Sequence, residues 1–329
     1  MVDWQSPRVA VVGAGGVGAH LAVRLQLSGT RVNLIARGDN LRVIREHGLT
    51  LLAGEERHVV PIAATDDYDS LREADLIIVS VKYRALDSVL EQLRSRLHGE
   101  ARVLFVMNGV PWWFDQDGKD SRSGRESVPL DRLLWGVVMA AGQLVEPGVV
   151  RNVSPGRNSI ELGYPDGHVD AALEAAARML QKAGVSAHVR DDIRSAIWFK
   201  LLTNAAQAMV CATVERSTRD TVRDPALRNV VIAAMREVLD VGHALGIHLT
   251  ADPVAMTEPS RSPAHRSSYL QDLDAGRPMD LESTIFAVIA SARQLDVPVP
   301  CLSTIAAIVA AKSEDAVAAH RGEVASGTH

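Results

Sequence analysis

The sequence has few of the features that mark secreted, metal-binding, membrane or nucleic-acid-binding proteins. Its 329 residues include only two cysteines, Cys211 and Cys301, too few for a disulfide framework or a zinc site, and we expect both in the core. The eleven histidines show no metal-ligand spacing, so no metal is predicted. No run approaches the ~18 uninterrupted apolar residues of a membrane span. Residues 1–5 lack the basic-then-apolar pattern of a secretory signal.

Charge excludes a further class of partner. The 35 basic and 40 acidic residues give a net charge of −5, so there is no general basic field for nucleic acid. We therefore expect a cytoplasmic protein with no metal, no membrane association and no nucleic-acid partner.

What the sequence does contain is enough apolar material for two domains, since 47% of the residues are hydrophobic. Over residues 1–190, short apolar runs alternate with helical patterns, which is typical of βαβ units on a parallel sheet. Residues 191–315 are rich in long helical patterns. We predict an α/β fold: a Rossmann-like, parallel-sheet N-terminal domain, an all-helical C-terminal domain that could form a homodimer, and a disordered tail at 316–329.

A glycine-rich motif stands between the first predicted strand and helix. It reads Gly13-Ala14-Gly15-Gly16-Val17-Gly18. Such glycines allow a tight turn, close approach of the backbone to a pyrophosphate and close packing of helix on sheet. In this strand–turn–helix context the motif predicts a dinucleotide site, with phosphates at the N-terminus of the helix.

The residue at the end of the second predicted strand indicates which dinucleotide. An NAD site has Asp or Glu there for the ribose 2′-hydroxyl, but this strand ends in Arg37. A guanidinium cannot accept that hydroxyl hydrogen, whereas it suits a 2′-phosphate, so the sequence favours NADPH over NADH. The alternative is an ordinary surface arginine.

Polar residues also follow two later predicted strands. Lys82 comes after the apolar run at 76–81 and Asn108 after that at 103–107. Ligands of open α/β sheets bind at the carboxyl ends of the strands. Lys82 and Asn108 are therefore candidates to contact the cofactor, although Asn108-Gly109 is also a good turn dipeptide.

A polar strip crosses the first helix of the predicted helical domain. Lys200 and Asn204 are four residues apart and Gln207 is seven from Lys200, so on an α-helix they share one face. Burying an unpaired ammonium is costly, so the strip is expected to line a cleft. There Lys200 could polarise a carbonyl and give up a proton. The alternative is a lysine that extends to solvent at a helix edge.

Together these segments resemble the ketopantoate reductases (2-dehydropantoate 2-reductases). The resemblance rests on the glycine motif with Arg37, on Val81-Lys82, on Asn108-Gly109, and on the helix from Trp198 to Asn204. It also includes Ser267-Ser268-Tyr269-Leu270-Gln271-Asp272 followed by Gly276-Arg277-Pro278. It implies NADP(H) as the cofactor and reduction of a 2-oxo acid to a 2-hydroxy acid, with 2-dehydropantoate (ketopantoate) to pantoate as the first candidate.

The resemblance also implies roles for individual residues. Lys200 matches the catalytic lysine, which would donate the proton. Asn204 matches a substrate-binding asparagine and Ser268 a serine that binds the substrate carboxylate. Lys82 and Asn108 match positions on the cofactor side.

The sequence departs from the family pattern in places. Asp280 stands where a glutamate is usual, and we assign it to the cofactor side, with Glu282 nearby. Ala208 replaces an expected asparagine that Gln207 could partly substitute. Residues 115–131 resemble an insertion and an exposed loop.

Two alternatives remain open from the sequence. One is a β-hydroxyacid dehydrogenase-type oxidoreductase, because those enzymes also pair a lysine with an asparagine four residues on. The other is a non-catalytic NADPH-binding sensor, in which Trp112 and Trp113 form an exposed contact patch.

Overall fold

The computed structural model describes residues 2–114, 128–139, 142–153, 158–260, 262 and 264–326. It has two compact units: Met1–Asn108 with Gln116–Ile193, and Gly109–Asp115 with Arg194–His329. The second unit begins close to the boundary that we placed after residue 190. It also takes in the segment Gly109–Asp115, which the sequence analysis assigned to the first domain.

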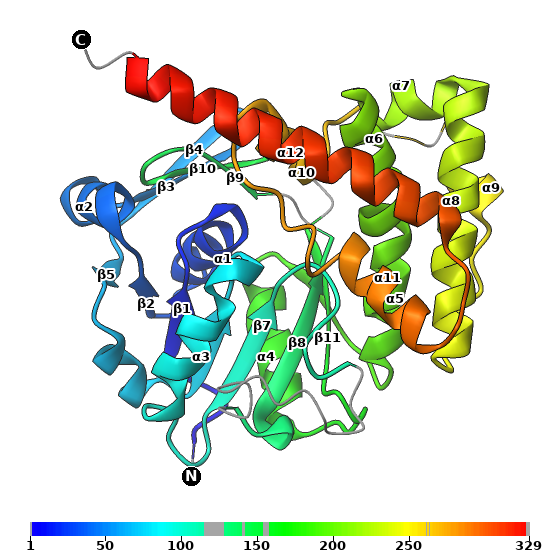
Figure 1. Ribbon diagram of the computed structural model, residues 1–329. Helices are drawn as coiled ribbons and strands as arrows, with labels where there is room; N and C mark the ends of the chain where they lie inside the picture. Colours follow the sequence, from blue (N-terminus) through cyan, green and yellow to red (C-terminus); the bar gives the residue numbers. More distant parts are fainter. Residues whose placement is uncertain are drawn as a thin grey trace. The chain divides into compact units, whose positions relative to one another are not determined.

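The first unit is built on an eight-stranded sheet (Figure 1). Its order is β12-β11-β8-β7-β6-β1-β2-β5. All neighbouring strands are parallel except β11, which is antiparallel to β8. The strands are β1 (Val9–Val12), β2 (Val32–Ile35), β5 (Ala63–Thr65), β6 (Leu76–Val79), β7 (Arg102–Val106), β8 (Leu133–Val138), β11 (Ser159–Gly163) and β12 (Ser186–Val189). Every residue of β1 and β6 is buried, as expected for central strands covered on both faces.

Four helices of the first unit follow the predicted pattern. They are α1 (Gly16–Leu27), α2 (Gly38–His47), α3 (Leu86–Arg94) and α4 (Ala171–Lys182). In α3 the apolar face expected from helical spacing is buried through Leu86, Val89, Leu90 and Leu93. At the start of α4, the Asp170 carboxylate accepts a hydrogen bond from the Leu173 amide at 2.8 Å, a typical N-cap.

A second, four-stranded sheet was not predicted. It has the order β4-β3-β10-β9, from β3 (Leu49–Ala53), β4 (Glu56–Val60), β9 (Gly142–Glu146) and β10 (Val149–Asn152). All four strands contact α1, which also contacts β1 and β2 of the main sheet. The small sheet therefore holds α1, and with it the glycine-rich motif, from the side away from the main sheet.

The second unit is helical, as predicted. Its elements are α5 (Ile193–Leu201), a π-helical stretch η5 (Leu202–Gln207), α6 (Ala208–Val214), α7 (Thr218–Arg223), α8 (Pro225–Ala244), α9 (Pro253–Met256), α10 (Ser268–Asp274), α11 (Ile285–Gln294) and α12 (Pro300–Ser326). The continuous helix Ile193–Val214 is long and apolar enough to span a membrane, but 72% of its apolar window is buried inside the structure. Its Trp198 is fully buried, and the indole Nε1 donates to the Val238 carbonyl of α8 at 2.8 Å.

Three expectations from the sequence need correction or restriction. The predicted disordered tail is wrong for residues 316–326, because α12 continues to Ser326 through an alanine-rich stretch with high helix propensity. Cys211 is buried as expected, whereas Cys301 is only partly buried near the start of α12. The proposed insertion at 115–131 lies outside the described residues up to 127, and Leu130–Arg132 form a short 3-10 turn.

Candidate active site

Four predicted cofactor-contacting positions follow four adjacent strands of the main sheet. The strands β7, β6, β1 and β2 are neighbours in this order, so their last residues lie side by side. These residues are Val106, Val79, Val12 and Ile35. Asn108 comes two residues after β7, Lys82 three after β6, Gly13 directly after β1 and Arg37 two after β2. Because these strands are parallel, all four positions belong to one carboxyl edge, where ligands of such sheets bind. Asn108, Lys82 and Arg37 are all exposed there.

The glycine-rich motif is packed tightly except at one residue. Gly13 has φ +107°, and a Cβ there would lie 2.3 Å from the Ser80 carbonyl oxygen. A Cβ at Gly16 would lie 2.0 Å from the Gly142 carbonyl of β9, and one at Gly18 2.0 Å from the Gly13 carbonyl. Gly15 has open space on its Cβ side. Three of the four glycines thus lie against backbone carbonyls, and among the four only Gly15 has room beside it for a ligand.

Among the described residues, no side chain caps the start of α1. Gly15 is the N-cap residue and offers no side-chain hydrogen bond, and the first turn contains no acidic residue. The free amides and the partial positive charge of the helix therefore remain available to an anion. This arrangement fits the pyrophosphate of a dinucleotide.

Asn40 positions this loop, a role that the sequence analysis missed. Its Nδ2 donates to the Ala14 carbonyl at 3.0 Å, and its Oδ1 accepts from the Gly148 amide at 2.7 Å. Asn40 lies in the first turn of α2, and Gly148 lies between β9 and β10. Because these partners are remote in sequence, nothing in the local pattern distinguishes Asn40 from other polar residues of α2.

Arg37 is held by Tyr68. Its Nη2 donates to the Tyr68 hydroxyl at 2.9 Å, and its Cζ lies 5.5 Å from the centroid of that ring. Within the described residues, Arg37 has no carboxylate at ion-pair distance. The remaining guanidinium N–H groups are free to bind an anionic ligand.

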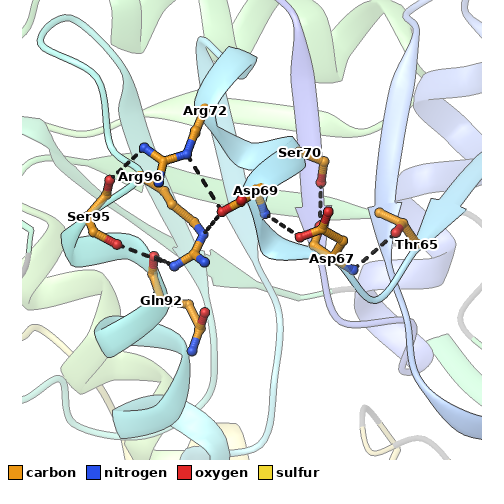
Figure 2. Close-up of polar contacts among 8 residues, drawn as sticks. All are labelled: Thr65, Asp67, Asp69, Ser70, Arg72, Gln92, Ser95 and Arg96. Carbon is orange, nitrogen blue, oxygen red and sulfur yellow. Dashed lines mark hydrogen bonds and ion pairs between the residues drawn. The ribbon is translucent and has the colours of Figure 1, made fainter.

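The 3-10 helix η1 (Tyr68–Glu73), which carries Tyr68, is fixed by a polar network (Figure 2). The Asp67 carboxylate caps η1 by accepting from the Asp69 amide at 2.9 Å. Asp69 in turn accepts from Arg96 Nε at 2.8 Å, just beyond the end of α3. Arg72 Nη1 donates to the Ser95 carbonyl at 3.0 Å. These bonds fasten η1, which carries Tyr68, to the segment that follows α3.

In the second unit, Lys200 is the lysine whose environment shifts its pKa. It lies near the end of α5, and burial lowers the pKa of its ammonium to about 8. Asn204 follows it on the π-helical stretch η5 and is partly buried. Short π-helical segments inside α-helices are frequent at functional sites.

The π-helical stretch removes the argument that placed Gln207 beside Lys200. We expected Gln207 on the same face because seven residues make about two turns of an α-helix. A π-helix has more residues per turn, so positions after Leu202 are rotated relative to that expectation. The Gln207 side chain is buried, with 8% of its surface exposed. Its assignment to the substrate therefore stays a prediction without geometric support.

The two serines of the predicted serine loop differ in their surroundings. Ser267 is buried and is the N-cap of α10, since its hydroxyl accepts from the Leu270 amide at 3.2 Å. Ser268 is exposed, and its hydroxyl has no partner among the described residues. Of these two serines, only Ser268 has a hydroxyl without a partner in the described part of the chain, and its role in binding the substrate carboxylate stays a prediction.

The remaining residues of this segment hold it together. Buried Asp272 accepts from Arg277 Nε at 3.0 Å, and its backbone carbonyl accepts from the Arg277 amide at 2.8 Å. The Arg277 pair thereby joins the serine segment to the Gly-Arg-Pro turn. Asp280 follows on this turn and is partly buried, whereas Glu282 is exposed.

Comparison with known proteins decides the family. The model described as "Ketopantoate reductase PanE/ApbA" matches residues 9–167, and that described as "Ketopantoate reductase PanE/ApbA C terminal" matches residues 192–313. A 2-dehydropantoate 2-reductase from Mesorhizobium japonicum is 30% identical over 319 residues, which cover 92% of this chain and 96% of the relative. The chain belongs to the ketopantoate reductase family.

Solved structures agree with this membership. The structure of a PanE/ApbA family ketopantoate reductase from Ralstonia eutropha JMP134 matches with a TM-score of 0.81 and 25% identity, over 94% of this chain and 99% of that one. A ternary structure of D-mandelate dehydrogenase with NADH and anilino(oxo)acetate matches with a TM-score of 0.83 at 22% identity, over 94% and 99% of the two chains. The second likeness shows the shared fold alone.

These findings confirm the predicted family, fold class and enzyme class. The chain is an oxidoreductase of the ketopantoate reductase family, whose cofactor is NADP(H). Matches to this family's models on both parts of the chain leave the β-hydroxyacid dehydrogenase alternative without support.

The proposed contact patch of the sensor alternative is wrong. Trp112 and Trp113 are buried, with 7% and 2% of their surfaces exposed. Next to them, the ring of Phe114 stacks on Trp198 with centroids 5.3 Å apart. The Phe114 carbonyl also accepts from Arg194 Nη1 at 2.9 Å. Both tryptophans are therefore buried and do not form an exposed patch.

Proposed function

We propose that this ketopantoate reductase family member reduces a 2-oxo acid to a 2-hydroxy acid with NADPH, and that 2-dehydropantoate is its first candidate substrate. The observation that carries the proposal is Lys200, an ammonium whose pKa burial lowers to about 8, four residues before Asn204. A group with this pKa is largely protonated at neutral pH and releases its proton readily. Such a group suits a carbonyl that must gain a proton during reduction.

The first unit provides the residues that would bind the cofactor. The backbone at Gly13–Gly18 and the uncapped start of α1 would hold the pyrophosphate, with close approach at Gly15. Arg37, oriented by Tyr68, would bind the 2′-phosphate and so favour NADPH over NADH. Lys82 and Asn108, at the same edge, are assigned to the ribose and nicotinamide side of the cofactor. The family resemblance also assigns Asp280 to the cofactor. When bound, NADPH supplies the hydride that reduces the keto carbon.

Lys200 would supply the proton. As the keto carbon is reduced, negative charge develops on its oxygen, and the Lys200 ammonium stabilises that charge and donates a proton from Nζ. The product is the 2-hydroxy acid, and the neutral amine then regains a proton from solvent. Because the pKa of Lys200 is about 8, its neutral amine takes up a proton again readily at neutral pH.

The substrate would be bound by Asn204, Ser268 and Gln207. The unpartnered Ser268 hydroxyl can donate to the substrate carboxylate, and the Asn204 amide can bond the hydroxyl or keto oxygen. Ala208, buried at the start of α6, offers a methyl group where the family pattern has an amide. The preference among branched 2-oxo acids therefore depends on which part of the substrate lies beside the Ala208 methyl group.

The proposal is tested by product analysis with the purified chain. Incubation with 2-dehydropantoate and NADPH should yield pantoate, identified by mass spectrometry, with one NADP⁺ formed per pantoate. A panel of other branched 2-oxo acids defines the preference. Absence of a 2-hydroxy acid product from every member of the panel would reject the proposed reaction. The expected homodimer and cytoplasmic location stay predictions, which light scattering and cell fractionation test.

A further inference from the structure

A large cavity lies at the edge of the main sheet opposite to the cofactor-contacting positions. Its volume is about 1000 Å³, and all of its walls belong to the first unit. Val9 and Val32, the first residues of β1 and β2, form part of its floor. The glycine-rich motif begins at Gly13, four residues after Val9 and so roughly 13 Å away at ~3.3 Å per residue. The cavity is therefore separate from the predicted dinucleotide site.

Two cations at this cavity have no carboxylate partner in the described part of the chain. They are Arg31, just before β2, and Lys182, at the end of α4. A single lining carboxylate, Glu73 at the end of η1, has no ion pair among the described residues either. The uncompensated charge at the cavity is therefore positive.

Two further lining arginines are neutralised by neighbours. Arg8 pairs with Asp75 at 3.0 Å, and Arg178 pairs with Glu174 at 3.2 Å along α4. These pairs leave Arg31 and Lys182 as the cations that an anion would meet without displacing a protein carboxylate.

The rest of the cavity surface combines apolar side chains with uncharged polar ones such as Gln5 and Asn33. Trp4 and Pro7 line it from the N-terminal segment, and Ala175 and Met179 line it from α4. The Trp4 ring is held by Arg102, whose Cζ lies 6.0 Å from the ring centroid. Ligand sites combine such an apolar lining with a few placed polar groups, and their volumes reach about 1000 Å³.

We propose that this cavity binds a small amphiphilic organic anion, one with an aromatic or branched apolar body and one or two negative charges. Arg31 and Lys182 bind the charged group, while Trp4, Pro7 and Met179 contact the body. Because the cavity and the glycine-rich motif lie at opposite ends of β1, occupancy does not compete with NADP(H). This inference is independent of the proposed reaction.

The test uses 8-anilinonaphthalene-1-sulfonate, a fluorescent aryl sulfonate, on the full chain saturated with NADP⁺. We expect saturable binding, displaced by phenyl phosphate but not by phenol, its neutral counterpart. Arg31→Glu and Lys182→Glu should each weaken binding about tenfold. Arg94→Glu, an exposed site on α3 outside the cavity, is the matched control and should bind like the parent chain.

One further variant is expected to bind the dye more tightly, which distinguishes an effect of charge from a loss of folding. Glu73→Gln removes the unpaired carboxylate and should tighten the binding that phenyl phosphate displaces severalfold, whereas a partly unfolded variant would bind the dye on exposed apolar surface without such displacement. Thermal denaturation of each variant verifies the fold. Absence of saturable binding under NADP⁺, or binding that is insensitive to the charge at positions 31, 73 and 182, would overturn the proposal.

Discussion

The Arg37 guanidinium and the Tyr68 hydroxyl are joined by a 2.9 Å hydrogen bond at the end of β2. Arg37 comes from the strand–helix turn, whereas Tyr68 comes from η1, about thirty residues later, which the network around Asp69 fastens to α3. An exposed arginine would otherwise sample many rotamers, and fixing it lowers the entropy lost when it binds an anion. If Arg37 binds the 2′-phosphate as proposed, this hydrogen bond contributes to the preference for NADPH over NADH.

Arg37→Gln should therefore weaken NADPH specifically. A hydrogen bond to a charged group contributes roughly 1.5–3 kcal/mol, so the KM for NADPH should rise about 10- to 150-fold while that for NADH changes little. Steady-state kinetics with both cofactors measures this. Arg42→Gln is the control, because Arg42 is exposed on α2, the helix that begins directly after Arg37. This change should leave both KM values unchanged. Equal losses for the two cofactors would contradict a 2′-phosphate role.

Asn40→Ala should impair cofactor binding more than the chemical step. The change leaves the Ala14 carbonyl and the Gly148 amide without their partner, and loss of such bonds costs about 1–3 kcal/mol. We expect the KM for NADPH to rise about tenfold with kcat changed less than twofold. A purely structural role would instead lower the melting temperature without raising this KM in the folded enzyme.

The reaction should depend on pH through Lys200. The pKa of about 8 means that the proton donor is lost as pH rises through 8, so kcat/KM for 2-oxo acid reduction should fall above that pH. Oxidation of the 2-hydroxy acid needs the neutral amine and should rise over the same range. Profiles in both directions from pH 6 to 10 measure this. Reduction that stays constant from pH 7 to 9.5 would contradict the assignment.

The same buried ammonium should cost stability. Because its folded pKa lies below the usual value of 10.5, the unfolded chain binds more protons between pH 8 and 10.5, and stability should rise with pH there. Lys200→Met should be more stable than the parent chain at pH 7 by on the order of 1–3 kcal/mol. The difference should shrink above pH 8. Urea unfolding at pH 7 and 9.5 tests both, and a less stable Met variant at pH 7 would disagree.

Substitutions of Ser267 and Ser268 should have different effects, one on stability and the other on substrate binding. Ser267→Ala removes the cap of α10 and should cost about 1 kcal/mol of unfolding free energy. Ser268→Ala removes a hydroxyl that has no protein partner, so stability should hold while the KM for the 2-oxo acid rises about tenfold. Urea unfolding and kinetics on the same two variants measure this. The reverse pattern would exchange the two roles.

The parts of the site that could be predicted from the sequence depend on local signals. Gly13–Gly18 and Arg37 follow short apolar strands, and that pattern alone placed them at the carboxyl edge. The second sheet could not be predicted in this way, because β3 pairs with β10, about a hundred residues later. Asn40 gains its role from the turn between β9 and β10, and Tyr68 from its contact with Arg37. Such partners come together only in the folded chain.

Two errors have the same physical origin. The helix period that joined Gln207 to Lys200 assumes an α-helix throughout, and the π-helical stretch at Leu202–Gln207 alters it. Trp112 and Trp113 were predicted to form an exposed contact patch, but both are buried. The Trp113 ring contacts that of Phe114, which in turn stacks on Trp198, more than eighty residues later, and local sequence cannot show such a contact.

The most direct test of the account is NADPH oxidation by the purified chain with 2-dehydropantoate, compared between the parent and Lys200→Ala. General acid assistance contributes typically 10²- to 10⁴-fold, so kcat should fall by that factor while NADPH binding is retained. Such a loss, with NADPH affinity unchanged by fluorescence titration, is the result the account predicts. A Lys200→Ala enzyme that reduces 2-dehydropantoate as fast as the parent would contradict it.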